Sequence, residues 1–182
     1  MKGFLSNPLI KFTVLASSLY LSWYVLYEFV LKLHSDFDSV IINNLVILSR
    51  KGLSAIGFET MDTVTDGFQN MVQISDTLGV RVGAPCDGIV LLALFTVFIV
   101  AFPGPWKHKA WYLPAGLIAI HLINVLRIMA LVLIVNKNPD WLQFNHDYTF
   151  TILVYAFVFA LWMIWVYKFS PLKGLKNEET TD

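Results

Sequence analysis

Four apolar segments constrain this chain more than any other feature of its sequence. They run from Phe12 to Leu31, from Gly88 to Phe102, from Trp111 to Val135 and from Tyr148 to Tyr167. Their only charged residues are Glu28 and Arg127. A helix crosses the hydrocarbon core of a bilayer with about 20 residues, so the pattern predicts about four transmembrane helices. The second segment is shorter, and we expect the chain before it to dip into the membrane interface or the bilayer to thin there.

The composition supports an all-α membrane protein. The chain is 57% hydrophobic and 14% charged, whereas soluble domains average about 45–50% apolar and about 25% charged residues. The formal net charge is zero, so nothing indicates a nucleic-acid partner. Cys86 is the only cysteine, which excludes an intrachain disulfide and a zinc site of four cysteines. The sequence also lacks a His-Glu-x-x-His motif, and we expect no metal and no cofactor.

The region 32–87, between the first two segments, is expected to lie outside the cytoplasm. Val40 to Ile56 has apolar residues at helical spacing but also carries Asn43, Asn44, Arg50 and Lys51. This pattern favours an amphipathic helix on the membrane surface, with a fifth span as the alternative. Gln69–Ile74 and Leu78–Val82 flank a short polar turn and predict a small β-hairpin. Together, the apolar segments and this region predict one integral membrane domain, 1–168, followed by a cytoplasmic tail, 169–182.

The distribution of lysine and arginine predicts the orientation. One side carries Lys2, Lys11, Lys107, Lys109, Lys168, Lys173 and Lys176. The other side carries Lys32, Arg50, Lys51, Arg81 and Lys137, most of them in one long loop. Positive charge in short loops marks the cytoplasmic face. Both termini are therefore predicted to be cytoplasmic, in the cytoplasmic membrane, and the loop 136–147 is predicted to face outward. The first segment is expected to be an uncleaved anchor.

Three reactive side chains fall in one layer of this topology. Cys86 immediately precedes the second segment, Arg127 lies about 12 Å below the outer end of the third, and His146 immediately precedes the fourth. The layer predicts a cysteine-dependent site that opens on the extracytoplasmic side. We expect Asp87 to cap the helix that follows Cys86, and Asn124 to share a helix face with Arg127. Asp147, next to His146, is the third expected supporting residue.

Each of the three has a chemical reason to act. A helix start and a nearby cation are expected to lower the pKa of Cys86 and favour the nucleophilic thiolate. Arg127 cannot lose its proton, and its fork of donors suits a substrate carbonyl or an oxyanion. His146 can exchange protons near neutral pH, with His34 as the alternative for that role. His121 is expected to be packed and hydrogen-bonded, and His108 lies on the opposite side.

These residues resemble the motifs of a known family. Pro85-Cys86-Asp87-Gly88 at the head of an apolar helix resembles the cysteine signature of the exosortase/archaeosortase family. Asn124–Ile128 (NVLRI) is similar to its arginine motif, and Asn145–Tyr148 (NHDY) is similar to its histidine motif. The order of the motifs also agrees, over roughly Val80 to Tyr167. This chain is shorter than many members of the family.

The resemblance implies a membrane-embedded cysteine protease or transpeptidase. Such enzymes act on membrane-anchored proteins that carry a C-terminal sorting signal, made of a short motif, a hydrophobic helix and a basic cluster. By that likeness Cys86 would attack the scissile carbonyl, Arg127 would bind the oxyanion or orient the substrate, and His146 would move protons. The acyl group would then pass to an amine or to water. The alternative hypothesis is a non-catalytic membrane subunit for assembly or transport.

Overall fold

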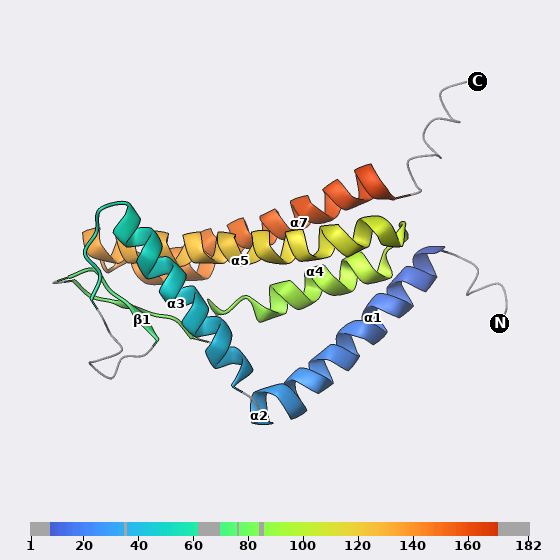
Figure 1. The fold of residues 1–182 in the computed structure, drawn as a ribbon, viewed down its shortest axis with the longest axis horizontal. Helices are drawn as coiled ribbons and strands as arrows, with labels where there is room; N and C mark the ends of the chain where they lie inside the picture. Colours follow the sequence, from blue (N-terminus) through green and yellow to red (C-terminus); the bar gives the residue numbers. More distant parts are fainter. Residues whose placement is uncertain (1–7, 35, 62–69, 76, 84–85, 171–182) are drawn as a thin grey trace, which may run out of the picture.

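A computed structural model describes residues 8–34, 36–61, 70–75, 77–83 and 86–170, and nearly all of them are helical (Figure 1). The helices are α1 (Pro8–Leu26), η1 (Tyr27–Leu31), α2 (Lys32–His34), α3 (Phe37–Ala55), α4 (Ile89–Ala101), α5 (Trp106–Lys137), α6 (Trp141–Phe144), η3 (Asn145–Thr149) and α7 (Phe150–Phe169). The strands are β1 (Met71–Val72) and β2 (Val80–Arg81). The predicted all-α membrane fold with a small hairpin is confirmed.

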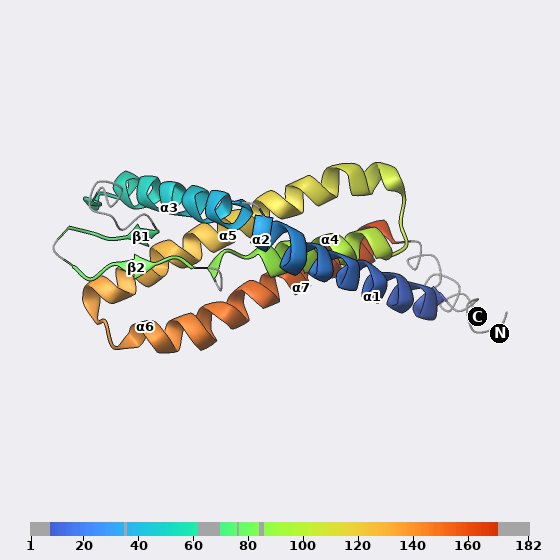
Figure 2. The ribbon, with the colours of Figure 1, turned by 90° about the horizontal axis from the view of Figure 1, so that it is seen from below.

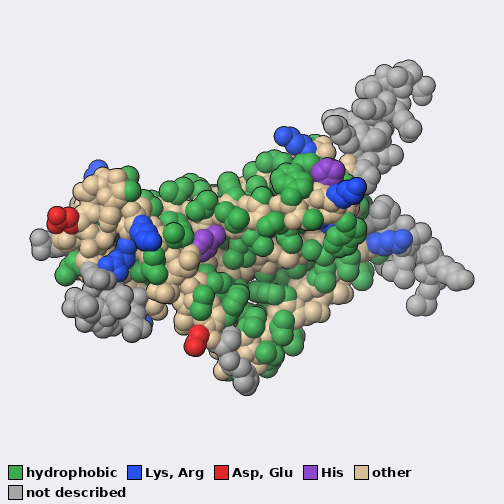
Figure 3. All heavy atoms as spheres, in the orientation of Figure 1, with side chains coloured by type: hydrophobic (Ala, Val, Ile, Leu, Met, Phe, Trp, Pro, Cys, Tyr) green, Lys and Arg blue, Asp and Glu red, His purple; other side chains and the backbone are tan. Residues whose placement is uncertain are grey.

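Within the described residues, three helical stretches are long and apolar enough to cross a membrane. They are Leu9–Leu31, Trp106–Lys137 and Trp141–Phe169. The second predicted span, Gly88–Phe102, forms α4, whose 13 residues reach only about 20 Å. It packs against α1, α5 and α7, so protein covers most of its length. Hydrophobic side chains cover most of the face between the two ends of the molecule in Figure 3, as a bilayer requires.

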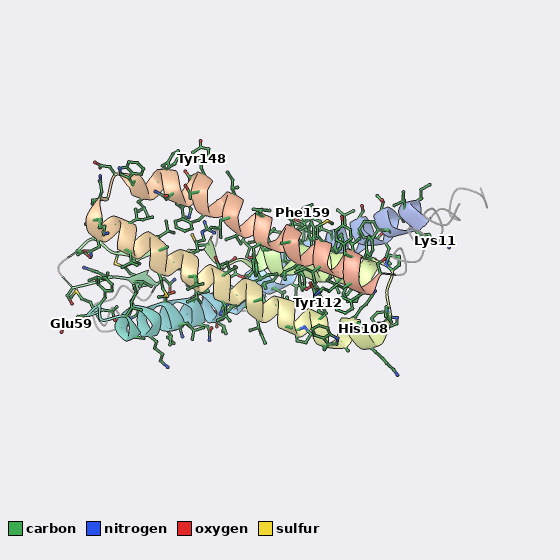
Figure 4. The ribbon with its side chains drawn as sticks, turned by 90° about the horizontal axis from the view of Figure 1, so that it is seen from above. Lys11, Glu59, His108, Tyr112, Tyr148 and Phe159 are labelled. Carbon is green, nitrogen blue, oxygen red and sulfur yellow. The ribbon has the colours of Figure 1, made fainter. Side chains whose placement is uncertain are left out.

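The two ends of the bundle differ in construction. Figure 4 shows Lys11 and His108 at one end, near the end of α7, and Glu59 at the opposite end. One hydrophobic core joins α4, α7 and the first half of α5. A second core joins α3, the hairpin and the second half of α5. Cys86 belongs to the second core and lies just before α4, so it marks the junction between the two cores.

Helix α3 accounts for the amphipathic segment predicted at Val40–Ile56. Leu45 and Leu53 of its apolar stripe are fully buried, and the helix packs mainly against α5 and the hairpin. The helix is not among the stretches apolar enough to cross a membrane, which argues against the fifth span. Protein, and not only the membrane surface, therefore covers the apolar side of this helix.

The hairpin is antiparallel, with Met71 paired to Arg81 and Val72 paired to Val80. It is shorter than predicted, and Gln69 of the predicted first strand lies outside the described residues. Residues 171–182 of the predicted cytoplasmic tail also lie outside them. Val72, Val80 and Val82 are buried in the second core, so the hairpin anchors the chain that leads to Cys86.

Candidate active site

The backbone around Cys86 is held on both sides. The Cys86 N–H donates to the carbonyl of Gly83 at 2.8 Å. The amide of Asn124 on α5 donates to the carbonyl of Cys86 at 2.7 Å. Gly88 has φ of +79°, and a side-chain carbon there would lie 3.0 Å from the Asn124 nitrogen. Glycine is therefore required both by the turn and by the close approach of α5.

Asp87 stabilises the start of α4, although the residue at the cap position is Gly88 and not Asp87 as predicted. Its Oδ1 accepts the N–H of Ile89 at 2.9 Å, so the carboxylate still satisfies one free donor of the helix. Its Oδ2 is buried and has no hydrogen-bond partner among the residues described. Burial raises the pKa of Asp87 from 3.8 to about 6, because the bond from Ile89 only partly offsets the lost hydration.

His146 contacts the thiol directly. Its Nε2 lies 2.8 Å from the Sγ of Cys86, which is 60 positions away in sequence. His146 sits in η3, a π-helical turn inside the long helical stretch Trp141–Phe169. On the other side of the ring, Nδ1 lies 2.8 Å from Oδ1 of Asp147. The predicted fourth span began only at Tyr148, but the helix starts at Trp141 and carries these polar residues within it.

Arg127 faces the protein interior and not the lipid. The residue is 7% exposed, and one terminal nitrogen of its guanidinium donates to the carbonyl of His146 at 3.4 Å. Its Nε is buried without a hydrogen-bond partner in the part of the chain that the structure describes. Thr151 also donates to the carbonyl of His146, at 3.0 Å. Arg127 therefore retains a buried donor that no described protein group occupies.

A cavity of about 340 Å³ opens beside these side chains. It is lined by Asp87, Gly88, Val90, Leu91, Arg127, His146, Asp147, Thr151, Val154 and Tyr155. Polar groups line one part, and apolar residues of α4 and α7 line the rest. The volume lies at the lower end of the range for ligand sites, roughly 300–1,000 Å³, and suits a few residues of an extended peptide.

The charge state of the thiol differs from the sequence-based expectation. Burial raises the pKa of Cys86, against the lowering effects of the Arg127 charge and of the hydrogen bond to Gly83. The expected lowering by a helix start and a cation is wrong, because the thiol is only 7% exposed and desolvation outweighs both. The resting thiol therefore keeps its proton and needs a base to remove it.

A sequence model of the transmembrane exosortases matches residues 20–167 of this chain. The chain belongs to the transmembrane exosortase family. The match covers most of the sequence and includes Cys86, Arg127 and His146. Neither a curated protein nor a solved structure matches the chain.

The exosortase fold brings all six predicted site residues into one neighbourhood. Cys86, His146 and Asp147 are joined by hydrogen bonds, Asn124 holds the Cys86 backbone, Arg127 contacts His146, and Asp87 lines the same cavity. His34 ends α2, but its side chain lies outside the described part of the structure. His121 is hydrogen-bonded to Asn44 at 2.8 Å, as expected.

Sequence reasoning missed two residues of the site, Gln143 and Thr151. Gln143 donates to Asp147 one helical turn later, and Thr151 donates to the His146 carbonyl. The spacing of Gln143 and Asp147 is the signal that could have revealed the first pair, because residues four apart on a helix face each other. The expected start of the helix at Tyr148 hid this spacing.

The raised pKa of Asp87 predicts a pH-dependent stability. The folded state binds this proton more tightly than the unfolded state, so the stabilisation is complete below about pH 3.8 and is lost as pH rises through about 6. Asp87→Asn keeps the capping oxygen and cannot ionise. Its free energy of unfolding relative to wild type should rise by on the order of 2 kcal/mol between about pH 4 and about pH 7.5.

Thermal unfolding of the two proteins in detergent at both pH values measures this difference. Asp36→Asn changes an exposed carboxyl and serves as the matched control. A constant offset between Asp87→Asn and wild type across the pH range would contradict the prediction.

Proposed function

We propose that this exosortase is a cysteine protease or transpeptidase that cleaves C-terminal sorting signals of exported, membrane-anchored proteins. The observation that carries the proposal is the 2.8 Å contact between the Cys86 thiol and the His146 imidazole beside a cavity that Arg127 lines. A nucleophile within hydrogen-bond reach of a base, next to a buried cationic donor, is the arrangement that acyl transfer requires. Cleavage of a co-expressed protein with such a signal, dependent on Cys86, tests it.

The first half of the proposed reaction forms a thioester. The Cys86 sulfur attacks the scissile carbonyl while its proton passes to Nε2 of His146. Arg127 donates to the oxygen that becomes negative, which is where its unpartnered Nε and its charge are useful. The imidazolium then gives its proton to the leaving amine as the C–N bond breaks. Asn124 keeps the Cys86 backbone fixed throughout, through its bond to the Cys86 carbonyl.

The second half returns the enzyme to its starting state. An amine or water attacks the thioester carbonyl, and His146 accepts its proton. The C–S bond breaks, and the proton returns to the sulfur of Cys86. An amine acceptor gives transpeptidation and water gives hydrolysis, so the same residues support both outcomes. The leaving amine carries away one proton and the acceptor supplies one, so the Cys86–His146 pair ends with the proton count it began with, and no cofactor takes part.

We further propose that the site opens on the extracytoplasmic face of the cytoplasmic membrane. Lys11 and the start of α5, which carries Lys107 and Lys109, lie at the end of the bundle remote from Glu59 (Figures 1 and 4). Basic residues in short segments favour the cytoplasm for that end. The hairpin, α3 and α6 would then lie outside, where the signal of an exported substrate arrives.

A pair of reporter fusions tests this orientation. A fusion after Lys176 should be active only as a cytoplasmic reporter, and an insertion between Gly57 and Phe58 should be active only as an extracytoplasmic one. Gly57 lies in a turn with φ of +93°, and a side-chain carbon at this position would meet nothing within 4 Å, so the insertion point is open. The opposite pattern would overturn the orientation and the access route of the proposed substrate.

A further inference from the structure

Gln143, Asp147, His146 and Cys86 form one continuous chain of hydrogen bonds. The side-chain nitrogen of Gln143 donates to Oδ2 of Asp147. Oδ1 of the same carboxylate lies 2.8 Å from Nδ1 of His146, whose Nε2 lies 2.8 Å from the Cys86 sulfur. Three of the four residues come from the turn α6–η3, which leads into α7 (Figure 2). The motif match accounts for the cysteine and the histidine but gives no role to Gln143.

The chemistry of each partner fixes the direction of these bonds. An ionised carboxylate can only accept, so Nδ1 of His146 must carry a proton. In the neutral ring Nε2 is then the acceptor, and the Cys86 thiol is the donor. This is the one arrangement of the neutral ring in which His146 can take the thiol proton. The identity of the tautomer therefore depends on Asp147.

Asp147 would not hold this arrangement unaided. The carboxylate is 41% exposed and follows His146 directly in the chain, so water competes for both of its oxygens. Gln143 occupies Oδ2 from the preceding helical turn, which leaves Oδ1 directed at the imidazole. His146 and Asp147 both lie in the π-helical turn Asn145–Thr149, a local irregularity of the kind that often occurs at functional sites.

We propose that Asp147 and Gln143 are positioning residues that hold His146 in the tautomer able to deprotonate Cys86. The inference extends the proposed function, because it names the groups that prepare its base. Asp147 fixes the proton on Nδ1 and stabilises the imidazolium after proton transfer. Gln143 fixes Asp147. Neither residue touches the reacting atoms.

Cys86 is the only cysteine, so the rate of its alkylation measures how readily the Cys86 thiol loses its proton to His146, and no substrate is needed. The full-length protein in detergent is treated with iodoacetamide over a range of pH, and the adduct is measured by intact mass. Asp147→Asn removes the charge and lets the introduced amide donate to Nδ1, which favours the wrong tautomer. We expect alkylation at neutral pH to fall by roughly tenfold or more. Processing of a sorting-signal substrate should fall by roughly 10²-fold.

The double variant Gln143→Glu with Asp147→Asn is the decisive arm. The introduced carboxylate at position 143 can only accept, so it binds the amide nitrogen at position 147 and turns the amide oxygen toward Nδ1. This restores the correct tautomer, and both rates should recover by at least roughly fivefold over Asp147→Asn alone. Asp140→Asn changes an exposed carboxyl immediately before α6 and should leave both rates unchanged.

Four outcomes are decisive. Recovery in the double variant supports the positioning role of Asp147 and Gln143, since a merely structural loss would not be repaired by a second change. Wild-type alkylation in Asp147→Asn, or a double variant no better than the single one, would overturn it. If alkylation responds as expected but Cys86→Ala still processes substrate, the positioning role of Asp147 and Gln143 is supported and the proposed proteolytic function is wrong.

Discussion

Cys86→Ala is expected to abolish processing of a co-expressed membrane protein that ends in a sorting signal, while leaving the exosortase folded. The thiol supplies the atom that forms the thioester, and no other cysteine exists to replace it. Losses of roughly 10⁴-fold or more follow the removal of a nucleophile from such a site. Alanine removes one small group from a largely buried position and should cost only about 1 kcal/mol of stability.

The measurement is the ratio of cleaved to full-length substrate, with the abundance of each variant followed in the same membranes. Ser49→Ala is the matched control, because it removes an equally small buried polar group on α3 that has no hydrogen-bond partner among the described atoms. Cys86→Ser keeps the shape but is a poor nucleophile, and it should also be inactive. Normal cleavage by Cys86→Ala at normal abundance would leave a non-catalytic membrane subunit as the better hypothesis.

Arg127→Lys is expected to lower processing by roughly 10²–10³-fold, the range found when one oxyanion donor is removed. Lysine keeps the positive charge but loses the planar fork: its donors all lie on one nitrogen and cannot reproduce the separate positions from which the guanidinium donates. The unpartnered Nε of Arg127 is one of the donors that disappear. A residue that only balanced charge would tolerate the change.

Alkylation of Cys86 separates the two roles of Arg127. The arginine charge lowers the pKa of the Cys86 thiol, against the effect of burial. Arg127→Met removes that charge, so the pKa should rise further and alkylation should need a higher pH. Arg127→Lys should keep a pH profile close to that of wild type while losing processing. Equal processing by the lysine variant and wild type would contradict the proposed role of Arg127 as a donor to the substrate oxygen.

The hydropathy of the chain was sufficient to predict the helices. A bilayer forces each spanning backbone to satisfy its own hydrogen bonds, so apolar runs such as 111–135 and 148–167 identify helices from local sequence alone. The residues at which each helix begins and ends were harder to predict. Gln143, His146 and Asp147 looked like loop residues, yet they lie inside a helix, because their polar groups bond to one another and to Cys86.

The sequence also predicted that Cys86, Arg127 and His146 lie at one level, because segment ends and residue spacing fix the height of each along its helix. Contact between their side chains could not be predicted in the same way, since the height of a residue does not determine how its helix is rotated or which helices pack beside it. Packing of α4, α5 and α7 around one core, and of α3 and the hairpin around another, decided that His146 meets the thiol. The raised pKa of Cys86 has the same origin. A charge or a helix start can be seen in the sequence, but desolvation depends on every segment that packs over the sulfur.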